Sequence, residues 1–254
     1  MLLAIDIGNT NITFGLYEGK KLGPRWRIRT IHEKMPDEYG ILLDQLFHHQ
    51  GYRPEQVTGV AVASVVPPLT QVFGQVCQEY IRQKPLVVDV GVKTGFRIRY
   101  EPPQGVGADR VVNAVGALVR YEPPLIIVDF GTATTFDVLL PPNVYLGGLI
   151  APGVNISRDA LVNRTAMLPK VAIRETSRIV GRNTADSIRS GLYHGTGALV
   201  DGVVDAICEE QDIDPTVIAT GGLAALIKNA SSRIEKVDPD LTLWGLREIW
   251  QRNS

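Results

Sequence analysis

The chain has 254 residues, of which 44% are hydrophobic and 21% are charged. This composition is typical of a globular protein with enough apolar chain for one large core or two modest ones, and it excludes the disordered and fibrous classes. The 26 basic and 27 acidic residues nearly balance, and no segment concentrates either sign, so we do not expect a nucleic-acid partner.

The N-terminal apolar run, residues 1–5, is ended by Asp6, well before a signal peptide would finish. No stretch approaches the roughly 18 apolar residues that span a bilayer, so we expect a cytoplasmic protein with no membrane partner. The two cysteines, Cys77 and Cys208, stand far apart with no cysteine or histidine at ligand spacing. This spacing excludes a disulfide framework and a zinc site, and we expect both cysteines to be buried.

Strands and helices alternate along the chain, which predicts an α/β fold. In chain order we expect strands over 2–6 and 12–17, a helix over 38–50, a strand over 57–66, a helix over 69–82, a strand over 85–90 and a helix over 109–120. The second half then has strands over 126–128 and 134–140, a long helix over 184–210 and a strand over 217–219. Gly51 is the expected C-cap of the first helix, and Asn183 or Thr184 is the expected N-cap of the last.

Two segments of the sequence resemble each other, residues 2–10 and residues 126–135. Each is an apolar run followed by Asp-x-Gly, then by hydroxyl or amide residues, then by a second run suited to a strand. Asp6 and Asp129 are 129 − 6 = 123 positions apart, close to half the chain. The repeat predicts a duplicated domain, with a first domain over 1–117 and a second over 118–254.

The Asp-x-Gly turn after the first strand is suited to binding phosphate. Gly8 lets the backbone turn sharply, so that successive N–H groups, the Asn9 amide and the Thr10 hydroxyl can point at phosphate oxygens. The Asp6 carboxylate repels a polyphosphate unless a cation intervenes, and Mg²⁺ prefers one or two carboxylates together with phosphate oxygens and water. An ordinary β-turn also has Asp and Gly at such positions. The second copy at residues 129–131 favours the phosphate interpretation, because two facing turns can clamp a triphosphate.

Other phosphate-binding and catalytic motifs are absent from the sequence. The chain has no G-x-x-x-x-G-K-[ST] loop, and Arg110 stands where the dinucleotide fingerprint starting at residue 105 has its third glycine. No G-x-S-x-G nucleophile turn occurs either. The sequence therefore disfavours the P-loop, Rossmann and serine-hydrolase classes.

A third group of polar residues lies at the start of the helix over 109–120. Glycines at positions 105 and 107 lead into this helix, and its first turn presents Asp109 and Arg110. The partially positive helix N-terminus favours an ionised carboxylate, which can accept the proton of an attacking hydroxyl in phosphoryl transfer. Because an ordinary aspartate is a weak base, we expect its position rather than its pKa to carry the effect. Aspartate is also common in first turns that have no catalytic role.

The sequence resembles the type III pantothenate kinase family at seven ordered motifs, whose spacing is kept from residue 2 to about residue 248. The matching stretches are Asp-Ile-Gly-Asn-Thr-Asn at 6–11, Gly-Ala-Asp-Arg-x-x-Asn-Ala at 107–114, Val-Asp-Phe-Gly-Thr-Ala-Thr-Thr at 128–135, Gly-Gly-x-Ile-Ala-Pro-Gly at 147–153, Asn-Thr at 183–184 with Ser-Gly at 190–191, Ala-Thr-Gly-Gly-Leu-Ala at 219–224 and Leu-Thr-Leu-x-Gly-Leu at 241–246.

The resemblance implies the fold of the actin-like ATPase and sugar-kinase superfamily, an α/β architecture of two ribonuclease-H-like domains with a nucleotide cleft between them. It implies a phosphotransferase that uses ATP with Mg²⁺ to convert pantothenate to 4'-phosphopantothenate in the first step of coenzyme A biosynthesis. It also implies a requirement for a monovalent cation, K⁺ or NH₄⁺, and a homodimer as the working state.

The resemblance also assigns roles to individual residues. The residues implied to bind ATP are Asp6, Ile7, Gly8, Asn9, Thr10, Asn11, Ile12, Thr13 and Thr132. The residues implied to bind pantothenate are Tyr100, Gly107, Ala108, Asp109, Arg110 and Thr184, the last of them expected to act from across the dimer interface. Asp109 is implied to be the catalytic proton acceptor and Asp129 the ligand of the monovalent cation. Asp6 is our candidate for binding Mg²⁺ through the phosphates.

Two positions depart from the family pattern. Tyr100 is followed by Glu101 and two prolines where family members often have Asn-Pro, and Ile12 replaces the more usual threonine of the first turn. Two other functions stay open from the residues alone. One is a nucleotide or polyphosphate hydrolase of the same superfamily, which would not need an acceptor-binding segment at 107–110. The other is a non-enzymatic, nucleotide-regulated assembly protein.

Overall fold

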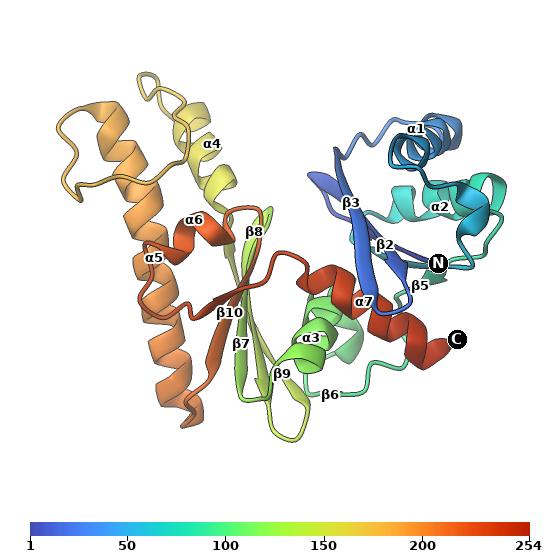
Figure 1. Cartoon of the computed structure of the whole chain (residues 1–254). Helices are drawn as coiled ribbons and strands as arrows, with labels where there is room; N and C mark the ends of the chain where they lie inside the picture. Colours follow the sequence, from blue (N-terminus) through green and yellow to red (C-terminus); the bar gives the residue numbers. More distant parts are fainter. The chain divides into compact units, whose positions relative to one another are not determined.

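The computed structural model describes all 254 residues, and the chain divides into two compact units, each built on one β-sheet (Figure 1). Unit 1 comprises Met1–Phe96, Glu101–Arg120 and Leu241–Ser254, and unit 2 comprises Arg97–Tyr100 and Tyr121–Asp240.

Unit 1 contains a five-stranded sheet in the order β3-β2-β1-β4-β5. Its elements are β1 (Leu2–Ile7), β2 (Asn11–Glu18), β3 (Lys21–Arg29), α1 (Pro36–His49), the 3-10 turn η1 (Pro54–Gln56), β4 (Gly59–Ser64), α2 (Pro67–Val76), the π-helical turn η2 (Cys77–Ile81), β5 (Leu86–Val87), the 3-10 turn η3 (Pro103–Gly105), α3 (Ala108–Arg120) and α7 (Leu241–Asn253). The first three strands form an antiparallel meander, and β4 runs parallel to β1 on its other side.

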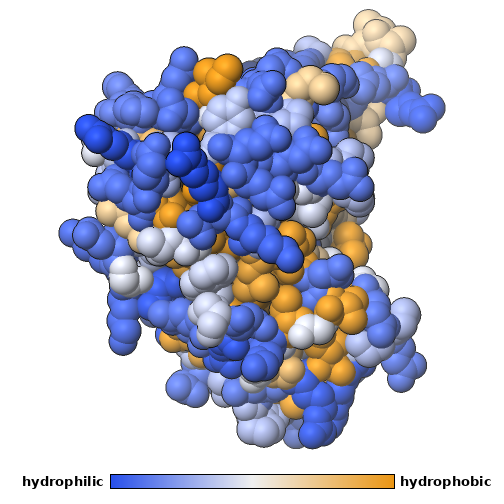
Figure 2. Space-filling model, turned by 90° about the vertical axis from the view of Figure 1, so that its right-hand side faces the viewer, coloured by the Kyte–Doolittle hydropathy of each residue, from blue (hydrophilic) through white to orange (hydrophobic).

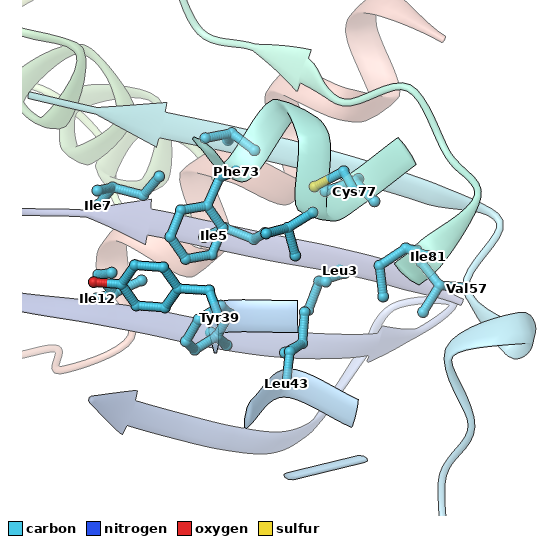
Figure 3. Close-up of a cluster of buried hydrophobic side chains, with 14 of the residues drawn as sticks. Leu3, Ile5, Ile7, Ile12, Tyr39, Leu43, Val57, Phe73, Cys77 and Ile81 are labelled. Carbon is cyan, nitrogen blue, oxygen red and sulfur yellow. The ribbon is translucent and has the colours of Figure 1, made fainter. Parts of the chain in front are cut away.

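One face of the unit 1 sheet is covered by α1 and α2. Because successive side chains of a strand point to opposite faces, Leu3 and Ile5 of β1 point to the same side and pack with Phe14 of β2. Tyr39 of α1 and Phe73 of α2 close this cluster, with ring centroids 4.9 Å apart (Figure 3). Each buried aliphatic or aromatic side chain of this kind contributes roughly 1.5–3 kcal/mol to folding.

The other face of the unit 1 sheet is covered by α7, against which α3 packs. Leu243 of α7 lies directly over Gly15 of β2, where a Cβ would come within 2.8 Å of its side chain. The backbones of α3 and α7 touch, because a Cβ on Gly116 or on Gly245 would overlap a carbonyl oxygen of the facing helix. The C-terminal helix therefore belongs to unit 1, and unit 2 ends at Asp240 rather than at the chain terminus expected from the repeat.

Unit 2 contains a six-stranded sheet in the order β11-β10-β7-β8-β9-β6. Its elements are β6 (Arg97–Ile98), β7 (Leu125–Phe130), β8 (Ala133–Leu140), β9 (Val144–Pro152), α4 (Val154–Arg164), α5 (Thr184–Gln211), β10 (Thr216–Gly221), α6 (Ala224–Lys228) and β11 (Lys236–Val237). As in unit 1, an antiparallel meander is followed by a strand, β10, that runs parallel to the first. The shared topology is what the sequence repeat predicts.

The core of unit 2 lies between its sheet and the helices α5 and α6. Ile126, Val128 and Phe136 of the sheet pack there with Tyr193 and Val204 of α5. The alternation of strand side chains places the neighbouring residues of β7 and β8 on the opposite face of the sheet.

A buried polar pair lies on that opposite face. The carboxylate of Asp137, which is 0% exposed, accepts a hydrogen bond of 2.5 Å from the hydroxyl of Tyr145. The hydroxyl of Thr135 donates to its other oxygen at 3.4 Å. These bonds offset the high free-energy cost of burying a carboxylate.

Most predicted elements are present, with altered bounds. The predicted helix over 69–82 is α2 followed by the π-helical turn Cys77–Ile81, and the predicted strand over 85–90 is reduced to Leu86–Val87. The long helix α5 is continuous, and the Asn183 side chain caps it by accepting the N–H of Asp186 at 2.9 Å. The sequence did not predict β3, an edge strand that contains Pro24.

The two cysteines differ in environment. Cys77 is buried, and burial raises the pKa of its thiol to about 12. Cys208 is only half-buried, and its sulfur accepts a hydrogen bond from the Arg233 guanidinium. The prediction of burial is thus confirmed for Cys77 alone.

None of the helices combines the length and the hydropathy that a membrane span requires. On the face drawn in Figure 2, hydrophilic residues predominate and hydrophobic residues form smaller areas among them.

Candidate functional site

The turn between β1 and β2 is tight, although Gly8 does not adopt the positive φ that glycine permits. The N–H of Gly8 donates to the carbonyl of Asn11 at 3.0 Å, and Asp6 is the second-last residue of β1, paired with Thr13 of β2. Asn9 and Thr10 lie at the tip and are exposed. Both residues are therefore at the surface of the unit.

The two isoleucines expected to bind ATP have buried side chains. Ile7 and Ile12 are 0% exposed and belong to the core beneath α1 and α2. They can contribute only backbone groups to a ligand. The side chain at position 12 points into the core. A threonine hydroxyl at this position would therefore also point away from the ligand side of the turn, and its replacement by isoleucine removes no phosphate contact.

The carboxylate of Asp6 lies on the face of the sheet that carries α3 and α7. Ala4 and Gly15 are paired across β1 and β2, and Gly15 contacts Leu243 of α7. Asp6 is two residues beyond Ala4 and therefore points to the same face. The side chain of Thr13, opposite Asp6, shares this face.

Asp109 lies in the first turn of α3, as predicted. Its Oδ1 accepts the N–H of Arg110 at 2.8 Å. The carboxylate folds back over Gly107, where a Cβ would lie 2.6 Å from the same Oδ1. The absence of a side chain at position 107 is therefore what leaves room for this carboxylate.

The start of α3 lies near the end of β1, where the parallel strands β1 and β4 of unit 1 have their carboxyl ends. The N–H of Val65, directly after β4, donates to the carbonyl of Ile7 at 3.1 Å. The Val65 side chain in turn lies 4.0 Å from the position of a Cβ on Gly107. The segment that carries Asp109 and the turn that follows Asp6 are thus linked through a single residue.

Burial raises the pKa of the Asp109 carboxyl above its usual value. The hydrogen bond from the Arg110 N–H and the positive charge of the Arg110 guanidinium act in the opposite direction, but they are smaller causes. This corrects the expectation of an ordinary, weakly basic aspartate: loss of solvation outweighs the groups that favour the ionised form at the helix start. A carboxylate with a raised pKa is the stronger proton acceptor.

Unit 2 has a corresponding turn after β7, which is one residue shorter than the turn of unit 1. The N–H of Gly131 donates to the carbonyl of Ala133 at 3.1 Å, and Asp129 is the second-last residue of β7, as Asp6 is of β1. Thr135 of β8 and Thr220 of β10 are the strand partners of Asp129, so the three side chains form a polar row on one face of the sheet.

The carboxylate of Asp129 lies over a glycine of the neighbouring strand. A Cβ on Gly221 would be 2.5 Å from Oδ1 of Asp129 and 2.7 Å from the carbonyl oxygen of Phe130. Gly221 has φ +89°, a conformation that L-residues with side chains rarely adopt. Two oxygens therefore approach the Gly221 backbone so closely that no side chain fits at this position.

The β7–β8 turn rests on the segment that follows β9. A Cβ on Gly153 would overlap the carbonyl of Thr132 and approach that of Gly131. Gly153 is the N-cap of α4, so the turn and the start of this helix pack backbone to backbone. Thr132 itself is exposed at the tip of the turn.

The other two expected pantothenate contacts lie in different parts of unit 2. Tyr100 follows the short strand β6 in the chain. Its ring lies 3.4 Å from the position that a Cβ on Gly147 of β9 would occupy. Thr184 is the first residue of α5, next to the Asn183 cap, and it is exposed.

Three residues that shape the turns were not predicted as site residues. Thr30, after β3, donates its hydroxyl to the carbonyl of Gly8, while Gly153 and Gly221 make room beside the second turn. Gly153 and Gly221 lie in the motifs at 147–153 and 219–224 that resemble the kinase family, so the sequence could have identified them as candidates. No pattern in the sequence identifies Thr30. The structure contains no group of three or more His, Cys, Asp or Glu side chains that could hold a metal ion.

Comparison with known proteins connects these features to a family. The family model described as type III pantothenate kinase matches residues 2–206 of the chain. A type III pantothenate kinase from Anaeromyxobacter sp. (strain Fw109-5) is 53% identical over 253 residues, covering 100% of both proteins.

Two solved structures share the fold at low sequence identity. The activator of the 2-hydroxyisocaproyl-CoA dehydratase from Clostridium difficile has a TM-score of 0.57 and 12% identity, covering 98% of this chain and 96% of its own. A protein from Porphyromonas gingivalis proposed to be an N-acetylglucosamine kinase has a TM-score of 0.54 and 13% identity, covering 100% and 99%. The two α/β sheets thus have the actin-like ATPase and sugar-kinase fold expected from the sequence.

Proposed function

The chain belongs to the type III pantothenate kinase family, and we propose that Asp109 is the residue that accepts the proton of the pantothenate hydroxyl. Membership of the family makes the protein an ATP-dependent phosphotransferase whose acceptor is pantothenate. It leaves the hydrolase and the assembly protein, the two other functions open from the residues, without a supporting observation.

One observation above all supports the role of Asp109. It lies in the first turn of α3, and this turn lies next to the turn that follows Asp6, at the carboxyl ends of the unit 1 strands. A proton acceptor has to lie within hydrogen-bond reach of the attacking hydroxyl. The raised pKa of Asp109 makes it a better base than an exposed aspartate. As the hydroxyl oxygen attacks the γ-phosphorus of ATP, its proton passes to Asp109 and the bond to the leaving ADP oxygen breaks.

The nucleotide phosphates are proposed to bind the backbone of the turn between β1 and β2. Within residues 6–13, the exposed tip offers the Asn9 amide and the Thr10 hydroxyl, with the Asn11 and Thr13 side chains at the start of β2. Thr132 is the proposed ATP contact of the second turn. Mg²⁺ would neutralise phosphate charge when it is bound with ATP. The Asp6 carboxylate, beside the turn, fits such an ion as a ligand reached through the phosphates or their waters.

The pantothenate site is proposed to include the segment Gly107, Ala108, Asp109 and Arg110, together with Tyr100 and Thr184. The first four residues surround the base and its helix start, which supports a role in holding the hydroxyl in line. The exposed position of Thr184, outside the packed core of unit 2, is compatible with a contact made from a second subunit.

We propose that Asp129 binds the monovalent cation, K⁺ or NH₄⁺. The proposal is supported by the Asp129 carboxylate and the Phe130 carbonyl, which both lie beside Gly221, because oxygen atoms are the ligands that K⁺ takes in proteins. One carboxylate with neutral oxygens suits a singly charged ion. Such an ion would offset charge on the phosphates as the transfer proceeds.

A homodimer is proposed from the exposed apolar surface of unit 2. Large hydrophobic side chains are exposed on β9, α4, the segment after it and α5: Leu149, Ile150, Ile156, Leu161, Met167, Ile179, Val180 and Leu199. A concentration of exposed apolar side chains in one unit is typical of an interaction surface.

The face of α5 supports the same proposal. A Cβ added to Gly191, Gly195 or Gly202 would meet nothing within 4 Å, whereas Gly197 packs tightly against Ala230 within the unit. Each glycine in a helix interior costs about 1 kcal/mol relative to alanine. Close approach of a second subunit along this open stripe would offset that cost.

The test is the release of ADP from ATP, measured with and without pantothenate. We expect release to depend on pantothenate, and Asp109→Asn to lower kcat by roughly 10²- to 10⁴-fold while ADP still binds. Asp89→Asn is the matched control, because Asp89 is exposed and also accepts the next backbone N–H, at 2.7 Å. Near-normal turnover of Asp109→Asn would remove Asp109 from the mechanism.

A further inference from the structure

We propose that Thr30 is a positioning residue for ATP, because it holds the two carbonyls that set the direction of the N–H groups in the turn between β1 and β2. This inference rests on the proposed binding of ATP phosphates to that turn. Thr30 follows β3, two strands away from β1 in the sheet, and is itself not a proposed ligand of ATP.

Thr30 contacts the turn through two separate hydrogen bonds. Its hydroxyl donates to the carbonyl of Gly8 at 2.6 Å, and its N–H donates to the carbonyl of Thr10 at 3.0 Å. Thr30 is only 8% exposed, so both bonds are shielded from competing water. One residue thus fixes the peptide unit that joins Gly8 to Asn9 and the one that joins Thr10 to Asn11.

These bonds set where the N–H groups point. The peptide bond from Gly8 to Asn9 is trans, and in a trans peptide the C=O and the N–H point in opposite directions. With the Gly8 carbonyl held toward Thr30, the Asn9 N–H points to the other side of the turn, where Asn9 and Thr10 are exposed. Phosphate binding by successive N–H groups depends on this orientation.

Thr30 is in turn anchored to the core of unit 1. The next residue, Ile31, donates its N–H to the hydroxyl of Tyr39 at 3.1 Å, and its carbonyl accepts that hydroxyl at 2.8 Å. The Tyr39 ring is 2% exposed, and Figure 3 shows its hydroxyl at the edge of the hydrophobic cluster, beside Ile12. A chain of hydrogen bonds therefore connects the turn to α1.

Preorganised donors bind without the entropy cost of ordering them, so loss of the Thr30 hydroxyl is expected to weaken nucleotide binding more than it weakens the fold. One hydrogen bond corresponds to a factor of roughly ten in an equilibrium constant. Neither hydrogen bond of Thr30 involves the segment that carries Asp109. Pantothenate binding should consequently be spared.

The experiment compares Thr30→Val, Thr30→Ser and Thr30→Ala with the wild-type enzyme and with Asp6→Asn. For each variant the Kd for ADP with Mg²⁺, the KM for ATP, the KM for pantothenate and the melting temperature are measured. Thr58→Val is the matched control. The hydroxyl and the N–H of Thr58 also donate to a backbone carbonyl, that of Met1, but at the opposite end of β1.

We expect Thr30→Val and Thr30→Ala to raise the Kd for ADP and the KM for ATP roughly tenfold, with the KM for pantothenate within twofold of wild type. Thr30→Ser should restore most of the affinity, because it keeps the hydroxyl. Thr58→Val should match wild type in nucleotide affinity, whatever its melting temperature.

Two outcomes would overturn the inference. If Asp6→Asn weakens nucleotide binding and the Thr30 variants do not, the turn binds ATP but Thr30 does not position it. If neither Asp6→Asn nor the Thr30 variants change nucleotide binding, the proposed ATP site itself fails, and the role of Thr30 fails with it.

Discussion

The substitution Gly107→Ala should separate the position of the catalytic carboxylate from the stability of the fold. A Cβ at position 107 would lie 2.6 Å from Oδ1 of Asp109, whereas ordinary contact begins at 3.4 Å. The carboxylate must therefore withdraw by about 0.8 Å. Only the end of a flexible side chain has to move, and Gly107 has no positive φ that would strain an alanine.

The expected loss follows from this displacement. A misplacement of about 1 Å at a reacting group can lower the rate roughly 100-fold, so we expect a loss of this order in kcat/KM for pantothenate. Stability should change by no more than about 1 kcal/mol, the range for exchanging glycine and alanine at a helix N-terminus. The Kd for ADP should not change, because the turn after β1 keeps its contacts.

The assay is steady-state turnover with both substrates varied, together with ADP titration and thermal unfolding. Gly74→Ala is the matched control, since Gly74 lies in α2 of the same unit and a Cβ there meets nothing within 4 Å. Gly74→Ala should keep wild-type turnover and gain up to about 1 kcal/mol of stability. Wild-type kcat/KM in Gly107→Ala would refute the reasoning that the carboxylate position is set by the missing side chain.

Three further predictions follow from the site and the surface. Burial raises the pKa of Asp109 in the folded state, so the stability that this carboxyl contributes is present below its unfolded pKa and is lost as pH rises through its folded pKa. At neutral pH the melting temperature of Asp109→Asn should therefore be higher than that of wild type. A difference in melting temperature that does not shrink toward acid pH would contradict this. Gly221→Ala should abolish activation of the enzyme by K⁺. The control Gly91→Ala should keep this activation, because Gly91 has a similar φ of +98° but open space around it. Equal K⁺ dependence of the two variants would exclude the site beside Asp129. Gly195→Glu should give a monomer in light scattering, and a persistent dimer would place the interface away from the open face of α5.

The sequence was sufficient to predict those features that depend on local chemistry. The Asp-x-Gly repeats at Asp6 and Asp129 predicted the two turns and the duplicated sheets, because each turn needs only a strand, a carboxylate and a glycine in order. The helix that starts at Asp109 was predicted from its apolar stripe.

Features that depend on tertiary packing were not accessible in this way. The pKa of Asp109 follows from burial, which the helix-start argument does not include. The role of Thr30 depends on the register of β3, an edge strand that was not predicted because its polar residues alternate with half-buried ones and it contains Pro24. The attachment of α7 to unit 1 depends on Gly116 and Gly245, whose meaning appears only when α3 and α7 face each other.

The central claim is that a carboxylate at the start of α3 takes the proton of pantothenate while the turn after β1 binds the phosphates. The most direct measurement is a crystal structure with a non-hydrolysable ATP analogue, Mg²⁺ and pantothenate. We expect the pantothenate hydroxyl within about 3.2 Å of an Asp109 oxygen, and phosphate oxygens against the N–H groups of residues 9 and 10. A pantothenate hydroxyl bound to a different carboxylate, or phosphates away from this turn, would contradict the account.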